Sequence, residues 1–123
     1  MIGEMRTAAL LAKAVANDAS ALDAASTLRA ATLGGAKALG WERRIGSIEV
    51  GKQADLTAIR IDDIETQPMY NVISQLIYAA GRHQVSDVWI AGARKLRGRV
   101  LVDLDVDALS ALARRWRERI ARD

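Results

Sequence analysis

The chain has 123 residues, half of them apolar and 27% charged, with no cysteine and a formal net charge of +3. This length allows one domain with a modest core, and the composition is that of an ordered protein without disulfides or thiolate metal sites. No apolar run could cross a bilayer and the first residues lack a secretory pattern, so the sequence favours the cytoplasm.

Helices are predicted in the first forty residues. GEMRTAALLAKAVAND, at 3–18, contains good helix formers and ends at Asn-Asp. Ser20 can cap a second helix over 21–32, and LGGAKALG at 33–40 continues it or forms a short helix closed by its last glycine. Because alanine side chains bury little area, we expect these helices to lie against something larger.

Strands are predicted in the middle of the chain. Two segments read as strands, DLTAIRI at 55–61, in which β-branched residues alternate with other residues, and VSDVWIAG at 85–92. The glycine that ends the second segment allows a turn, so this segment can form a hairpin with residues 93–102. The stretch VISQLIYAAG at 72–81 fits a helix or an apolar strand, and we favour the helix because Ala-Ala-Gly is a plausible stop.

Trp89 is expected to be a packing residue of the second strand. By alternation it shares a face with Asp87 and Ala91, which predicts half-burial rather than stacking on a substrate. If the ring is buried, Trp89→Ala should cost about 3 kcal/mol.

An amphipathic helix is predicted from Asp105 onward. Its last ten residues hold five Arg, one Glu and one Asp, which accounts for the whole net charge. This pattern favours a solvated basic face on a packed terminal helix over a phosphate-binding patch. The apolar stripe comprises Val106, Leu109, Leu112, Ala113, Trp116 and Ile120.

Catalytic residue patterns are missing. The single histidine, His83, is expected in a loop, and neither Ser74 nor Ser86 has the context of a catalytic serine. Adjacent Asp62 and Asp63 should point in opposite directions and be solvated. The residues therefore predict an α+β domain with no catalytic, cofactor-binding or metal-binding side chains of its own. GGAKALG lacks the spacing of a phosphate-binding loop.

Residues 31–63, ATLGGAKALGWERRIGSIEVGKQADLTAIRIDD, closely resemble the C-terminal signature of the amidohydrolase superfamily. There, an A-T-x-x-G-A-x-x-L-G helix leads into a G-S-I-x-x-G-K-x-A-D-L turn and strand. The flanking segments GEMRTAALLAKA and QPMYNVISQLIYAAGRHQVSDVWIAG are similar to the branch with 5-methylthioadenosine/S-adenosylhomocysteine deaminases and triazine and ammeline chlorohydrolases. The matching positions are Ala31, Thr32, Gly35, Ala36, Leu39, Gly40, Gly46, Ser47, Ile48, Gly51, Lys52, Ala54, Asp55 and Leu56.

This resemblance implies an α+β fragment of a larger fold. Family enzymes are roughly three to four times longer, with a (β/α)8 barrel that supplies histidine and aspartate metal ligands, and this chain is expected to start just after the last ligand. Residues 1–40 then resemble the closing barrel helices, 41–104 part of a small composite β-sandwich and its link to the barrel, and 105–123 a C-terminal helix.

The resemblance also implies a function for the complete enzyme. It would be a metal-dependent aminohydrolase acting on adenosyl thioethers with zinc or another divalent metal, whereas the chain alone would be inactive and hold no metal. The alternative is a non-catalytic interaction or oligomerisation module that pairs with a partner chain. The expected partners are a second copy or the missing N-terminal part, with no nucleic acid and no membrane.

The signature turn is interpreted as scaffold rather than catalysis. Glycines at 46 and 51 allow tight turns beside Ser47 and Lys52. Asp55, at the entrance of the strand, is expected to accept backbone N–H bonds from the preceding turn.

Overall fold

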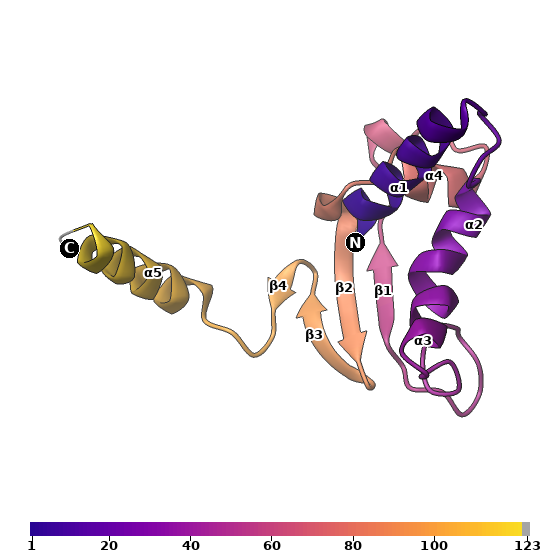
Figure 1. The fold of residues 1–123 in the computed structure, drawn as a ribbon. Coiled ribbons are helices and arrows are strands. Elements are labelled where there is room, and N and C mark those ends of the chain that lie inside the picture. The colour runs from indigo at the N-terminus through magenta and orange to yellow at the C-terminus, as the bar shows by residue number, and fades with distance from the viewer. Residues whose placement is uncertain (122–123) are drawn as a thin grey trace.

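The first helices of the chain lie beside a four-stranded antiparallel sheet, and the last helix stands apart (Figure 1). The structure is a computed structural model and describes residues 1–121. This arrangement confirms the α+β class. It also confirms the order of helices, strand, helix, hairpin and helix.

Helix α1 spans Ile2–Ala16 and ends at Asn17 in the left-handed conformation, with φ 49°. The prediction that Ser20 caps the second helix is wrong, since α2 spans Ala24–Arg29 and is capped by Asp23. The Asp23 carboxylate accepts the Ser26 N–H at 2.7 Å. The Ser20 hydroxyl is already engaged, because it donates to the Asp18 carboxylate within the turn.

Helix α2 continues through a π-helical turn, Ala30–Gly34, into α3, Gly35–Ala38. The Gly35 N–H reaches the carbonyl of Ala30, one residue further back than in an α-helix. The predicted continuation to Gly40 is therefore confirmed, and that residue has the positive φ of a helix stop, 68°.

The sheet has the order β1-β2-β3-β4, and its strands lie between residues 56 and 101. The segment at 72–81 is helical at its start, as predicted. A short 3₁₀ turn, Arg82–Gln84, connects it to the sheet. The element bounds are β1 Leu56–Ile59, α4 Val72–Tyr78, β2 Val85–Ile90, β3 Ala93–Arg97 and β4 Val100–Leu101.

The turn between β2 and β3 is held by the entrance of β1. Ala91 and Gly92 both have positive φ, 48° and 82°, as in the two-residue turns that suit a hairpin. The Asp55 carboxylate accepts the Ala91 N–H at 2.6 Å, and the Ala54 carbonyl accepts the Gly92 N–H at 3.0 Å. The expectation that Asp55 bonds to its preceding turn is thus wrong, because antiparallel pairing sets the start of β1 beside the end of β2.

Trp89 is half-buried on β2, which confirms its predicted role as a packing residue. It lies opposite Leu56 of β1, and the Arg94 guanidinium stands 5.3 Å from the centre of its ring. Ala91 does not share its face, because that residue has left the strand for the turn.

The core is thin and lies between α1 and α4. Ile2, Met5 and Ala9 of α1 pack with Ile77 of α4 in a buried cluster. A compact monomer of 13.3 kDa exposes roughly 6,500 Å², whereas this chain exposes 9168 Å². The fold therefore leaves much more surface in solvent than a self-sufficient domain of its size.

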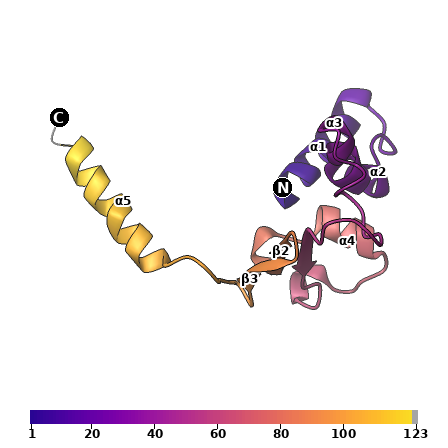
Figure 2. The same cartoon turned by 90° about the horizontal axis from the view of Figure 1, so that it is seen from below.

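Helix α5, Val106–Ile120, begins at Asp105, whose carboxylate accepts the Ala108 N–H at 2.9 Å. The helix is confirmed, but the prediction that it packs is wrong: none of its residues is buried, and it extends away from the sheet and the other helices (Figure 2). Among the described residues, no helix or strand packs against the apolar stripe of α5. No helix in this part of the chain is long and apolar enough to span a membrane.

The Asp55 bond can be tested by substitution. Asp55→Ala leaves the Ala91 N–H without its acceptor and should lower the free energy of unfolding by about 1 kcal/mol. Asp55→Asn keeps an acceptor oxygen and should lose less. Urea titration followed by circular dichroism measures both, and an unchanged midpoint for Asp55→Ala would contradict this role.

Candidate functional site

The side chains considered as catalytic candidates lie on separate elements. His83 is exposed on the 3₁₀ turn before β2. Ser74 lies in the first turn of α4, and the Ser86 hydroxyl donates to the Ala58 carbonyl at 3.4 Å. Within residues 1–121 no hydrogen bond joins any two of these three side chains, so the arrangement of a nucleophile and its base is not formed there.

Metal-binding groups are equally dispersed in the described residues. No three His, Asp or Glu side chains among them approach closely enough to hold an ion. Residues 1–121 therefore do not fit a catalytic zinc.

The adjacent carboxylates at the end of β1 share one partner. Arg60 donates from Nε to Asp62 at 3.2 Å and from a terminal nitrogen to Asp63 at 2.5 Å. The prediction that the two point in opposite directions is wrong, because β1 ends at Ile59 and strand alternation does not reach them. The hydrogen bond from Arg60 lowers the pKa of Asp62, which fits a solvated ion pair rather than an acid catalyst.

The signature turn forms a closed local network. Lys52 Nζ donates to Ser47 Oγ at 2.5 Å and lies 3.2 Å from Glu49 Oε1, and its side chain is only 11% exposed. The Ser47 hydroxyl, followed by Lys52, lowers the pKa of Glu49. Each of the three polar groups is thus occupied by another, as expected of scaffold.

Gly46 lies at a position where only glycine fits the turn. Its φ is 91°, and a Cβ placed there would lie 2.7 Å from the Cβ of Ala36 on α3. The glycine lets the turn pass directly against the helix. At Gly51 the space is open, and the positive φ of 92° is the only requirement.

Asp87 is an organising residue that the sequence interpretation missed. Its carboxylate accepts from Arg94 Nε at 3.1 Å and from the Gly98 N–H at 3.0 Å, so it joins β2, β3 and the following turn. The Arg94 hydrogen bond, followed by the Gly98 N–H, lowers its pKa to about 2. An acidic residue within the apolar run VSDVWI was the available signal, since hairpin pairing puts Arg94 within reach.

A groove of about 220 Å³ lies between α1 and the region of α2. Its walls are almost entirely apolar, and Glu4 is the one ionisable side chain among them. Such a groove can accept an apolar side chain but offers no acid, base or nucleophile pair. The lining residues are Met1, Glu4, Met5, Ala8, Leu22, Thr27, Ala30 and Ala31.

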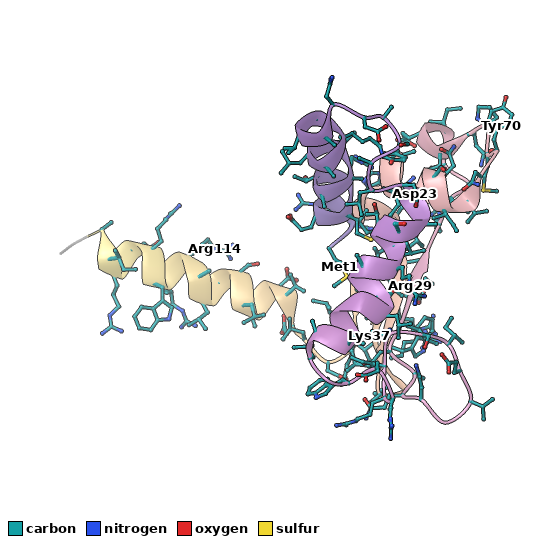
Figure 3. The ribbon with its side chains drawn as sticks, turned by 45° about the vertical axis from the view of Figure 1, so that its right-hand side comes forward. Met1, Asp23, Arg29, Lys37, Tyr70 and Arg114 are labelled. Atoms are coloured by element: carbon teal, nitrogen blue, oxygen red, sulfur yellow. The ribbon has the colours of Figure 1, made fainter. Side chains whose placement is uncertain are left out.

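Large apolar side chains are exposed on several faces (Figure 3). Tyr70, labelled at the edge of the molecule, is 91% exposed, and Ile48 and Val50 in the signature turn are fully or almost fully exposed. Self-sufficient soluble domains rarely expose so many large apolar side chains together. The other members include Leu10, Leu11 and Val15 on α1, Leu39 and Trp41 after α3, Ile64 and Met69 before α4, and the stripe of α5.

Residues 1–95 match the sequence profile of the amidohydrolase family, and the chain belongs to this family. It is 46% identical over 120 residues to a 5-methylthioadenosine/S-adenosylhomocysteine deaminase of Teredinibacter turnerae, covering 98% of this chain and 27% of that protein. A deaminase with the same description from Desulforudis audaxviator is 41% identical, with 98% and 28% covered. The chain thus spans about a quarter of the length of these curated relatives.

Solved structures agree with this assignment. A zinc-bound adenosine deaminase from Xanthomonas campestris is 68% identical with a TM-score of 0.96, and the match covers all of this chain and 28% of that one. A zinc complex of atrazine chlorohydrolase from Arthrobacter aurescens is 26% identical with a TM-score of 0.82, covering 90% and 25%. The described fold is therefore that of one quarter of an amidohydrolase structure.

Acid should weaken the fold through Asp87. Its folded-state pKa of about 2 lies below the ordinary 3.8, so the ionised carboxylate stabilises the fold above pH about 4. That contribution is lost as the pH falls from about 4 through about 2. Urea midpoints across this range should fall less for Asp87→Asn than for the unsubstituted chain, whereas Asp103→Asn, at an exposed ion pair with Lys95, should behave like the unsubstituted chain. Parallel acid profiles for all three proteins would exclude this role.

The isolated chain should not retain zinc. Because the described residues form no ligand cluster, gel filtration after incubation with zinc should leave substoichiometric metal on the protein and no ammonia release from adenosine above blank. His83→Ala should change neither result. Stoichiometric zinc together with ammonia release would contradict this expectation.

Proposed function

We propose that this chain is the C-terminal part of a metal-dependent amidohydrolase that deaminates the adenine ring of adenosyl thioethers, of the methylthioadenosine and S-adenosylhomocysteine type. The observation that carries the proposal is the extent of the similarity. Two deaminases named for these substrates are 46% and 41% identical to the chain, and each match covers 98% of it. The matches therefore continue past residue 95, where the family profile ends. The chlorohydrolase is only 26% identical over 90% of it.

In this enzyme the chain would supply structure. Helices α1 to α3 would close the barrel, and the apolar groove between α1 and the region of α2 supports this because it offers a seat for a neighbouring element. The sheet would form part of a composite sandwich. The outer edge of β1 supports this, since its sequence LTAI has no charge or proline to prevent another strand from pairing.

Metal ligands would come from another part of the enzyme. The deaminase and chlorohydrolase structures named above contain zinc, and residues 1–121 do not fit that ion. This quarter would therefore act on the reaction only by holding the shape of the fold.

A second candidate is a non-catalytic interaction module, which the exposed apolar faces favour. The intact mass of the protein purified from its source separates the two. A species several times heavier than 13.3 kDa supports the enzyme, and a species of 13.3 kDa supports the module.

A hybrid enzyme tests the deaminase proposal. This chain would replace the matched 28% of the Xanthomonas campestris deaminase, and the hybrid should release ammonia from adenosine and from methylthioadenosine. The control hybrid carries the corresponding quarter of the Arthrobacter aurescens chlorohydrolase and should be impaired, because its contacts to the rest of the protein differ. A folded hybrid with this chain that binds zinc but deaminates neither nucleoside would contradict the proposal.

Association of the isolated chain is a further expectation. The exposed faces of α1 to α3 and the open β1 edge should drive pairing with a second copy when the rest of the enzyme is absent. Light scattering over a dilution series should give masses above 13.3 kDa that rise with concentration. A compact monomer that unfolds cooperatively at low micromolar concentration would overturn this expectation.

A further inference from the structure

Helix α5 needs a surface that the described residues do not provide. Isolated helices of about 12–15 residues are marginal in water, and α5 has 15 residues, none of them buried. Its stripe residues Leu112 and Trp116 are 42% and 53% exposed. Figure 3 shows the helix, with Arg114 labelled, surrounded by no other element.

Helix α5 nevertheless has the same position relative to the other elements in the structure of a much longer protein, the Xanthomonas campestris deaminase. The family profile ends at residue 95, before the helix begins. The Xanthomonas campestris structure matches the whole chain with a TM-score of 0.96. Because α5 makes up 15 of 123 residues, so high a score requires the helix to stand at the same position in that structure. The part of that protein outside the match is 72% of its chain, since the match covers 28%.

The chemistry of the stripe defines what it binds. Leu112 and Trp116 line one surface groove of α5, of about 320 Å³, together with Arg115 and Arg119. The Arg119 guanidinium lies 5.2 Å from the centre of the Trp116 ring. A matching surface is apolar with carboxylates at its edge.

A second copy is the weaker occupant. In a two-fold dimer formed through α5 alone, each copy would contribute only its stripe, whose side chains are already about half covered by the helix itself. A 15-residue helix is about 22 Å long and about 10 Å across. One face of it offers on the order of a few hundred Å², below the ~800 Å² per partner typical of a stable interface. The rest of the enzyme is much larger than α5, so the area that it can offer to the stripe is not limited in this way.

We infer that α5 is a docking arm that binds the preceding three-quarters of its own enzyme through its apolar stripe, with Leu112 and Trp116 at the centre. This inference rests on the proposed function, because it requires that the chain be part of a longer amidohydrolase.

Hydrogen exchange of the α5 amides tests the docking arm in two proteins. In the isolated 123-residue chain these amides should exchange nearly unprotected at every concentration. In the hybrid with the Xanthomonas campestris deaminase they should exchange at least about tenfold more slowly. The double substitution Leu112→Gln and Trp116→Gln should abolish that protection.

The matched control is Arg114→Gln with Glu118→Gln, which adds the same residues on the opposite face without changing net charge. The exchange rates of the α5 amides in this control should stay within about twofold of those in the unsubstituted hybrid. Unprotected α5 amides in the hybrid would overturn the inference, and so would protection in the isolated chain that rises with concentration, which would identify a second copy as the occupant. If the α5 amides are protected in the hybrid but the hybrid has no deaminase activity, the result would contradict the proposed function and not the docking of α5.

Discussion

The contact of α1 with the end of α4 is the interaction on which the rest of the fold depends. Ile77 is fully buried against Met5 and its neighbours on α1, and Ile59 of β1 and Val85 of β2 pack on the same cluster. Arg6 of α1 donates to the carbonyls of Ile77 and Ala80 at 3.2 and 2.7 Å. Those carbonyls lie at the C-terminus of α4, where the helix itself cannot satisfy them. One helix thus supplies both the apolar and the polar contact that hold the helical layer on the sheet.

Few other buried side chains support that junction. Alanine is frequent in the helical layer, and alanine burial contributes little per residue. The polar contacts found elsewhere, at Asp55, Asp87 and Lys52, fix turns and hairpins rather than bury area. Polar contacts therefore fix the individual turns of the chain, whereas little buried apolar area holds its layers together.

Local signals in the sequence predicted most of the elements, because helix formers, strand alternation and glycine turns act over a few residues. The cap at Asp23 could not be separated from Ser20 by sequence alone, since both are good capping residues and the turn at Asp18 decided between them. Partners across the sheet, such as Asp55 with Ala91, depend on strand register. The solvent exposure of α5 could not be inferred either. An amphipathic pattern predicts that the apolar stripe is packed, but it does not show which residues cover the stripe.

The π-helical turn at Ala30–Gly34 is a place where this chain could lose one residue without turning the helix that follows. A π turn absorbs one extra residue within an α-helix, so the residues after it keep the orientation they would have in a helix one residue shorter. Ala36, which follows the turn, packs directly against Gly46. Loss of one residue from this turn would leave a regular helix with Ala36 in place, whereas loss of one residue within α3 would rotate the positions that follow it by about 100°. Deletion of one residue should therefore disturb the packing after it less in this turn than in α3.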